Sequence, residues 1–430
     1  MTPSARLFSA QDILNEWDKQ QKPLTDILRD WGKGHRFAGS KDRAAIAGIV
    51  YDCLRCRLSA QCQMDDATAR ATVLGMLKRV RGLPLPDVAG LFSGEKFSSP
   101  VLNATEMILY ERDFPENAPL HAAGDFPECI TISLETVFGE NVVSEMHAMI
   151  FRASLDLRVN VLKAQREDVL RDLEAFVPSC TPYCPWGIRI PLGEGKAPSV
   201  QQETSFLKGD FEIQDEGSQL VALLCKPFAQ GTIIDLCAGG GGKTLALAAM
   251  ADNQSKIYAG DSKLARILPI QDRLKRSGVT NVTLCLPDGQ TDIWKPYEHT
   301  ADLVVVDAPC SGTGTWRRSP ESKWRLSPSI IKKRIEDQEQ ALDKAAELVK
   351  PGGCIAYITC SVLPEENDEN ILSFHKRHTN YTFLDIRSVL KEVPVGSLEE
   401  NVYFTRFGLM MTPLRTLTDG FYISFLQRSI

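Results

Sequence analysis

The sequence predicts an α/β protein whose largest domain is built on a parallel sheet. Three observations support this prediction. From about residue 218 to residue 430, short apolar strands alternate with helical segments, which is typical of a parallel sheet with helices on both faces. Four consecutive glycines, residues 239–242, closely follow the first of these strands. Residues 1–150 mainly show helical spacing of their apolar side chains.

The composition is that of an ordinary globular protein. The 430 residues are 43% hydrophobic and 24% charged, which suits a chain of two or three domains. No apolar run reaches the ~18 residues of a membrane span, and the first residues lack the apolar stretch of a secretory signal. We therefore expect a cytoplasmic protein with no membrane partner, whose twelve cysteines are reduced. Because the formal net charge is −6, binding to a nucleic acid would depend on a local basic patch.

The first part of the chain, residues 1–150, is expected to form an all-α domain. Apolar residues recur at helical spacing in several stretches, including 67–80, and turn-rich stretches such as 82–86 separate them. Cys53 and Cys56 have the spacing of half a zinc site, but no second pair with a histidine completes it. We therefore expect no metal, and we expect both cysteines to pack within a helix.

A small α+β domain is expected over residues 151–217. Alternating apolar and polar residues indicate a strand at 157–161, and a helix is expected at 166–176. Loops rich in proline and glycine then lead to the main domain, residues 218–430.

The main domain alternates strand and helix candidates. Strands are expected at 232–238, 256–261, 282–287, 303–307 and 354–359, with a final strand at 420–426. Helices are expected at 243–250, 263–276 and 328–349. Ser327 is placed to cap the last of these helices, and Pro328 to open it.

The glycine loop, residues 239–242, predicts a bound cofactor. It follows a strand, and Lys243 opens a helix, so the backbone can approach a ligand closely and present N–H groups to it. A phosphate-binding loop is one interpretation, although Cys237 stands where that pattern requires its first glycine. A dinucleotide site is a second interpretation, with Asp261 at the end of the next strand as the ribose ligand.

S-adenosylmethionine is a third interpretation, and it accounts for more residues. It predicts a ribose-binding acid after the second strand, where Asp261 stands. It also predicts a polar contact after the third strand, where Asp288 stands, and chemistry at the end of the fourth, where Asp307 stands. Ligands of open parallel sheets lie at the carboxyl ends of the strands, where these aspartates and Asp235 all fall. One aspartate alone could simply cap a turn, but four at these strand ends favour a ligand site.

Two cysteines lie at the ends of two neighbouring predicted strands. Cys310 follows Pro309 in a turn-forming stretch, and Cys360 lies between Thr359 and Ser361. A free cysteine is often only a small buried hydrophobic side chain. The tight polar turns beside a predicted cofactor loop favour a sulfur nucleophile instead.

These motifs resemble those of the RsmB/Sun/Nop2 family of RNA 5-methylcytosine methyltransferases, and the resemblance covers nearly the whole chain. Its most specific pieces are the stretches 307–314 and 359–367, supported by 235–244 and 214–219. Where the family usually has Ala-Pro, this chain has Gly239 and Gly240, and we expect a more flexible loop as a result. Residues 41–43 and 51–55 resemble the NusB-like RNA-binding domain of the bacterial RsmB branch.

The resemblance implies a Rossmann-like domain that uses S-adenosyl-L-methionine to methylate carbon 5 of a cytosine in RNA. It implies 16S ribosomal RNA as the substrate, with transfer RNA as the alternative. Cys360 would add to carbon 6 and make the ring an enamine that attacks the methyl group. Cys310 would assist release of the product, and Asp307 would hydrogen-bond the cytosine near ring nitrogen 3. DNA cytosine methyltransferases use a Pro-Cys thiol at the position of Cys310, so spacing alone leaves the order of the two thiols open.

The cofactor contacts predicted in this way extend from the first strand to the fourth. They are Cys237, Ala238, Gly239, Gly240, Gly241, Gly242, Lys243, Asp261, Asp288 and Asp307. No metal and no obligate protein partner are implied.

A basic stretch, residues 315–335, follows Cys310. It contains seven cations against one acid, Glu321, together with Trp316 and Trp324. Cations for phosphates and aromatic rings for stacking are typical of binding to single-stranded nucleic acid, so we expect an RNA-binding loop at the mouth of the site. From other classes, a P-loop nucleotide hydrolase and an inactive RNA-binding assembly factor are the alternatives.

Overall fold

The computed structural model describes residues 1–20, 22–193 and 198–430, and the chain divides into two compact units. The helical unit comprises Met1–Arg152 and a later segment, Trp316–Leu326. The sheet unit comprises Ala153–Leu192, Pro198–Thr315 and Ser327–Ile430. Within the described ranges, no helix combines the length and the apolar character needed to cross a bilayer.

The described part of the helical unit is built from helices and loops, which confirms the helical character predicted for the first part of the chain. The helices are α1 (Pro3–Lys19), α2 (Leu24–Gly34), α3 (Ser40–Arg55), α4 (Arg57–Met64), α5 (Ala69–Arg79), α6 (Leu85–Leu91), α7 (Ala104–Glu111), α8 (Leu120–Ala123), α9 (Thr131–Phe138), α10 (Val142–His147) and α17 (Pro320–Lys323). Ile13, Val50 and Leu74 belong to their common core. Cys53 and Cys56 are fully buried in it. Among the described residues, no group of three or more His, Cys, Asp or Glu side chains is placed to hold a metal.

The segment 316–326 belongs to this core, which corrects the prediction of an exposed RNA-binding loop. Trp316 and Lys323 are fully buried. The Lys323 ammonium donates to the carbonyl oxygen of Arg55 at the end of α3 (2.9 Å). The same ammonium lies over the rings of Trp316 and Trp324, 5.4 and 5.3 Å from their centroids. The cation and the aromatic rings that would suit RNA binding therefore pack against one another here, because two rings and a carbonyl oxygen stabilise the buried Lys323 ammonium.

Other cations of the basic stretch 315–335 are also engaged. Arg317 is buried. Lys333 and Arg334, on a helix of the sheet unit, both pair with Asp337, at 3.0 and 3.2 Å. Arg318 is exposed. The positive surface that composition predicts over this stretch is thus smaller than its count of cations indicates.

The main sheet of the sheet unit has the strand order β11-β12-β13-β9-β8-β5-β6-β7, with β10 paired to β13. The parallel strands are β5 (Thr232–Asp235), β6 (Lys256–Gly260), β7 (Val282–Cys285), β8 (Ala301–Asp307) and β9 (Val349–Thr359). The antiparallel additions are β10 (Tyr381–Phe383), β11 (Tyr403–Phe404), β12 (Gly408–Met411) and β13 (Phe421–Arg428). The five predicted parallel strands are confirmed. The chain order reverses between β5 and β8, the switch point at which ligands of such sheets bind.

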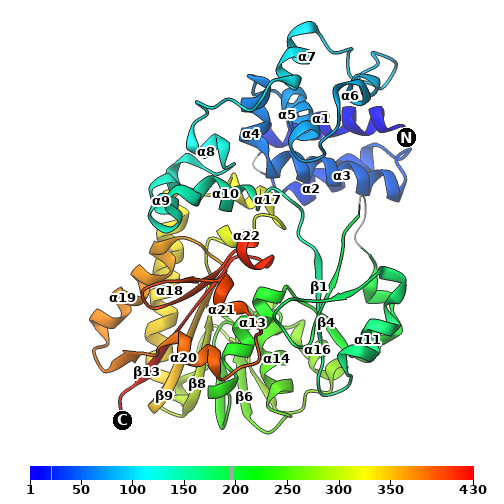
Figure 1. Cartoon of the computed structure of the whole chain (residues 1–430). Helices are drawn as coiled ribbons and strands as arrows, with labels where there is room; N and C mark the ends of the chain where they lie inside the picture. The colour runs from blue at the N-terminus through cyan, green and yellow to red at the C-terminus, as the bar shows by residue number, and fades with distance from the viewer. Residues whose placement is uncertain (21, 194–197) are drawn as a thin grey trace. The chain divides into compact units, whose positions relative to one another are not determined.

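Helices cover both faces of the main sheet (Figure 1). On one face, α13 (Glu216–Leu224), α14 (Gly242–Met250) and α20 (Ile386–Lys391) share an apolar cluster with strand residues such as Ile233 and Ala356. On the other, α18 (Pro328–Leu348) packs against β8 and β9, and α19 (Asp368–Arg377) packs against α18. Short helices α21 (Leu398–Asn401) and α22 (Pro413–Thr416) lie in the connections between late strands. Ser327 caps α18 by accepting from the Ile330 amide, as predicted.

One predicted helix is divided. The stretch 263–276 forms α15 (Leu264–Ile267) and α16 (Ile270–Ser277). Pro269 lies between them, and because proline has no N–H and disfavours helical geometry in the residue before it, a continuous helix cannot form there.

A small antiparallel sheet precedes the main one in the chain. Its order is β2-β3-β1-β4, with β1 (Leu155–Val159), β2 (Ser179–Cys180), β3 (Gly187–Ile190) and β4 (Phe211–Ile213). Two helices, α11 (Arg166–Asp172) and α12 (Thr204–Lys208), accompany it. Leu157, Val169 and Ile188 belong to a core of its own.

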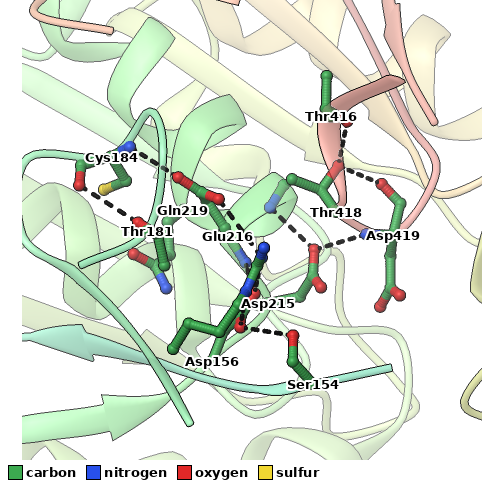
Figure 2. A network of polar contacts seen from close by, with 12 residues as sticks. Ser154, Asp156, Thr181, Cys184, Asp215, Glu216, Gln219, Thr416, Thr418 and Asp419 are labelled. Carbon is green, nitrogen blue, oxygen red and sulfur yellow. Dashed lines mark hydrogen bonds and ion pairs between the residues drawn. The ribbon is translucent and has the colours of Figure 1, made fainter. Parts of the chain in front are cut away.

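A buried polar network joins the small sheet to the start of α13 (Figure 2). The Asp156 carboxylate on β1 accepts hydrogen bonds from Arg189 on β3, at 2.7 and 2.8 Å, and from the Glu216 amide at 3.1 Å. Glu216 in turn accepts from the amides of Tyr183 and Cys184, at 2.7 and 2.8 Å. Buried polar groups bonded in this way fix geometry as well as register, so the small sheet is held to the helix that covers β5 and its neighbours.

Candidate active site

The structure brings Cys310 and Cys360 together. Cys310 follows β8, and Cys360 follows β9, its parallel neighbour. Their sulfur atoms are 3.3 Å apart, and both side chains are half-buried. Both thiols are therefore within reach of one bound molecule at the carboxyl edge of the sheet.

The surroundings of the two thiols differ. The hydrogen bond with Cys360 raises the pKa of Cys310 well above its ordinary value, and burial and the Glu366 carboxylate raise it further. Cys310 therefore keeps its proton at neutral pH and can donate it toward the other sulfur.

Asp307, the last residue of β8, is held by a cation. Its carboxylate forms an ion pair with Lys243 in the first turn of α14, at 2.7 Å. Lys243 is buried and lies over the ring of Phe421, 5.3 Å from its centroid. The Asp307 side chain stays 35% exposed, so an oriented carboxylate is available to a ligand beside Cys310.

The glycine loop forms a tight turn between β5 and α14. Gly241 has φ +81°, and a Cβ there would lie 2.3 Å from atoms of Ile270, so only glycine fits. Gly239 has φ +51°, a conformation that favours glycine over the alanine usual in the resembling family. Before the turn, Cys237 is half-buried, and burial raises the pKa of its thiol above the ordinary value, so it remains neutral.

Asp235 at the end of β5 leaves one buried acceptor without a partner. Burial raises the pKa of this carboxyl to about 7, against the effect of a hydrogen bond from Thr244 Oγ1 at 2.6 Å. Its Oδ1 has no hydrogen-bond partner in the part of the chain that the structure describes. A buried acceptor of this kind calls for a donor that the protein itself does not supply.

Asp261 and Asp288 follow the next two strands, β6 and β7. Asp261 is buried and accepts from the Gly239 amide at 3.2 Å, so its carboxylate lies against the glycine turn. Asp288 is exposed, and its carboxylate accepts from the amides of Thr291 and Gln290, which lower its pKa to about 2. Of the two, Asp261 is in direct contact with the loop, whereas Asp288 is bonded within its own turn.

Two residues to which the sequence analysis gives no role contact the segment around Cys310. Glu366 is fully buried and accepts from the Ser311 amide at 2.8 Å. Gln338 on α18 donates to the Pro309 carbonyl at 3.1 Å and to Glu366 at 3.0 Å. Glu366 lies inside the motif 359–367, which could have drawn attention to it. Gln338 lies in the middle of a helix and carries no local signal.

Comparison with known proteins assigns the family. Residues 222–427 match the model of the 16S rRNA methyltransferase RsmB/F family. A probable ribosomal RNA small subunit methyltransferase B of Synechocystis is 30% identical over 307 residues, which are 71% of this chain and 67% of that protein. The chain belongs to the RsmB/F family. Membership sets aside the P-loop hydrolase and the dinucleotide enzyme that the glycine loop alone leaves possible.

Two other relatives in the family match over shorter portions of their length. The ribosomal RNA small subunit methyltransferase B of Sodalis glossinidius is 33% identical over 63% of this chain and 58% of that protein. A probable enzyme of the same name from Bacillus subtilis is 31% identical over 63% of this chain and 59% of that protein. The matched region thus spans about three fifths of the length of these two relatives.

Solved structures share the fold. The crystal structure of PH0851 has a TM-score of 0.70 at 23% identity, covering 100% of this chain and 99% of that one. The structure of NSun6 from Pyrococcus horikoshii has a TM-score of 0.60 at 21% identity, covering 71% of this chain and 99% of that one. A methyltransferase homolog from Pyrococcus horikoshii has a TM-score of 0.57 at 25% identity, covering 72% and 97%. These likenesses support the Rossmann-like methyltransferase fold.

The cofactor of this methyltransferase family is S-adenosylmethionine, and the residues around the glycine turn fit it. The turn at Gly241 admits close approach of a ligand, and the first turn of α14 presents backbone N–H groups. The buried Asp235 oxygen and the Asp261 carboxylate, which follow the parallel strands β5 and β6, add two acceptors at the carboxyl edge of the sheet. This set of donors and acceptors suits a zwitterionic, hydroxyl-bearing molecule.

Proposed function

We propose that this protein methylates carbon 5 of a cytosine in RNA, with Cys360 as a covalent nucleophile and S-adenosylmethionine as methyl donor. The observation that carries the proposal is the pair of sulfur atoms 3.3 Å apart at the ends of β8 and β9. Carbon 5 of cytosine is a poor nucleophile, and addition of a thiolate at carbon 6 activates it by covalent catalysis. Methylation of an oxygen or nitrogen atom requires no such thiol.

Cys360 acts first in the proposed reaction. Its thiolate bonds to carbon 6, and the electron pair of the 5,6 double bond moves to carbon 5. The bound cofactor supplies the electrophilic methyl group that carbon 5 takes up. Once Cys360 is a thioether, its hydrogen bond with Cys310 weakens, and the pKa of Cys310 falls because that bond is the largest cause of its rise. Cys310 releases its own proton to solvent, and its thiolate then removes the proton from carbon 5, while the Cys360 sulfur leaves with its electron pair as the double bond reforms.

The Asp307 carboxylate is proposed to bind the cytosine near ring nitrogen 3, where charge develops on addition. The 2.7 Å ion pair with Lys243 fixes the orientation of this carboxylate. Because a carboxylate only accepts hydrogen bonds, its donor on the base would be the 4-amino group next to ring nitrogen 3, and the fixed orientation spares this contact any reorganisation.

The cofactor contacts are proposed along the carboxyl edge of β5, β6, β7 and β8. They are Cys237, Ala238, Gly239, Gly240, Gly241, Gly242, Lys243, Asp261, Asp288 and Asp307. Asp261 is assigned to the ribose hydroxyls, since its buried carboxylate lies against the glycine turn.

The proposed substrate is 16S ribosomal RNA, because the family and the relatives named above carry that activity in their names. The target cytosine is expected in an unpaired segment, since extruding it from a duplex costs a few kcal/mol. A protein with this substrate works in the cytoplasm. The helical unit is proposed to be a NusB-like RNA-binding domain, to which exposed cations such as Arg318 contribute.

The test uses the whole protein with S-adenosylmethionine and either 16S ribosomal RNA or transfer RNA. Bisulfite sequencing reads the product, and denaturing gels detect covalent RNA–protein adducts. We expect methylation of the ribosomal RNA, no adduct with Cys360→Ala, and a persistent adduct with Cys310→Ala. Cys180→Ala is the matched control because Cys180 is exposed. The opposite adduct pattern would exchange the two roles, and absence of methyl transfer to both RNAs would refute the proposal.

A further inference from the structure

A buried carboxylate contacts the residue that follows Cys310. Glu366 is fully buried, and its carboxylate accepts hydrogen bonds from both the amide (2.8 Å) and the hydroxyl of Ser311. It also accepts from Gln338 Nε2 at 3.0 Å. Among the residues that the structure describes, it forms no ion pair, so three hydrogen bonds alone hold this group.

The same two side chains hold both sides of Cys310. Glu366 binds the amide of Ser311, the residue after the cysteine. Gln338 Nε2 binds the carbonyl of Pro309, the residue before it, at 3.1 Å. The backbone that carries the thiol is therefore bonded at both flanking peptide groups to one buried pair.

This pair is itself fixed by neighbouring groups on β9 and α19. Asn370 Nδ2 donates to Gln338 Oε1 at 2.8 Å and to the Tyr357 hydroxyl at 3.2 Å. The Tyr357 hydroxyl donates to the Glu366 carbonyl at 2.7 Å. All four side chains are buried. A connected buried network of this kind is rigid, and such support decides how exactly a reactive group is aimed.

We propose that Glu366, together with Gln338, is a positioning residue that aims the Cys310 sulfur for release of the methylated product. This inference rests on the proposed function, in which Cys310 takes the carbon-5 proton. Neither side chain needs to touch the substrate. Each acts through the peptide groups on the two sides of Cys310.

The charge of Glu366 adds an effect that packing alone would not produce. Its negative field is one of the causes that raise the pKa of Cys310, after the hydrogen bond with Cys360 and burial. The release rate should rise with pH as Cys310 loses its proton. Replacing the carboxylate with an amide lowers the pKa of Cys310, so this rise should occur at lower pH. A role confined to stability would leave this profile in place.

The decisive variant is Glu366→Gln, which keeps the size of the side chain. Its amide nitrogen would replace Oε2 beside the Ser311 hydroxyl, which must then accept instead of donate. The two hydrogen bonds to Oε1 also lose their charge assistance, so the backbone next to Cys310 is held less firmly. A displacement of about 1 Å costs roughly 10²-fold in rate. We therefore expect single-turnover release to slow by about 10–100-fold, with adduct accumulating, while adduct formation and cofactor affinity stay within about threefold of wild type.

The controls separate charge from shape. Glu366→Asp keeps the charge and should leave the pH profile near that of wild type. Gln338→Met removes both donors without altering charge, so release should slow with no shift in pH. Glu369→Gln makes the same chemical change at an exposed carboxyl on α19 and should behave as wild type.

Release at wild-type rate with an unshifted pH profile in folded Glu366→Gln would overturn the inference. Should Glu366→Gln and Gln338→Met both fail to fold, Ser311→Ala decides, since it removes a single hydrogen bond to Glu366. A few-fold slower release supports the inference, and an unchanged rate refutes it. Failure of the proposed function is a separate result, because the wild-type protein would then form no adduct and transfer no methyl group.

Discussion

Truncation of Trp316 tests whether the segment after Cys310 belongs to the helical core or binds RNA. The side chain of Trp316 is completely buried. Replacing such a residue with alanine costs about 3–5 kcal/mol. Its indole N–H has no partner among the described residues, so no hydrogen bond is lost on truncation. The ring also covers the Lys323 ammonium, 5.4 Å from its centroid, which keeps the expected cost in the upper part of this range.

Hydrogen exchange followed by mass spectrometry measures this loss within the helical unit. Trp316→Ala should lower the opening free energy of peptides from α3 and α5 by about 3–5 kcal/mol, which is an increase in exchange of roughly 10²–10⁴-fold. Phe97→Ala is the control, since Phe97 is 63% exposed in the same unit, and its effect should stay within about 0.5 kcal/mol. Unchanged exchange in α3, together with weaker RNA binding, would show that the tryptophan stacks on nucleic acid and does not pack.

Four further outcomes follow from the geometry. A mild thiol oxidant such as diamide should form a disulfide between Cys310 and Cys360, whose sulfur atoms are 3.3 Å apart. This disulfide should abolish activity until a reductant restores it. Peptide mapping that finds no such disulfide would contradict the contact. Burial lowers the pKa of Lys323 to about 8 from 10.5. Between about pH 8 and pH 10.5 the unfolded chain therefore binds more protons than the folded protein does. As the pH rises through this range, the contribution of Lys323 to the free energy of unfolding rises by up to about 3 kcal/mol. Lys323→Met should flatten that rise in urea unfolding at pH 7.5 and 9.5. Asp261→Ala should weaken S-adenosylmethionine binding about 10–100-fold in calorimetry, the loss of one or two charge-assisted hydrogen bonds. Arg318→Glu should weaken RNA binding and reduce its salt slope by about one unit, and an unchanged slope would exclude this exposed cation from the interface.

Regular elements with strong local signals were predictable. The five parallel strands are short apolar runs, and Ser327 with Pro328 marks the start of α18 at the residue where the structure begins it. The divided helix at Pro269 shows the limit of periodicity, because apolar spacing continued through a residue that cannot sustain the helix. Local chemistry, in this case a missing N–H, overrides the pattern.

The meeting of Cys310 and Cys360 was also predictable, for a topological reason. Parallel neighbours end at the same edge of a sheet, so residues that follow two such strands come together however far apart they lie in the chain. Glu366 and Gln338 could not be found in this way. Their contacts with the Cys310 segment join α18, the end of β9 and the turn after β8, and only packed side chains decide which polar groups meet there.

The sequence by itself determined the alternation of strands and helices, the glycine turn and the strand ends that bear the thiols and acids, because spacing and backbone chemistry are local properties. The tertiary structure alone decided which side chains are buried. Lys323 and Trp316 have the composition of an RNA-binding loop, yet they lie in a helical core. Burial depends on partners such as the Arg55 carbonyl, 268 residues away in the chain, and no local pattern records a contact at that distance.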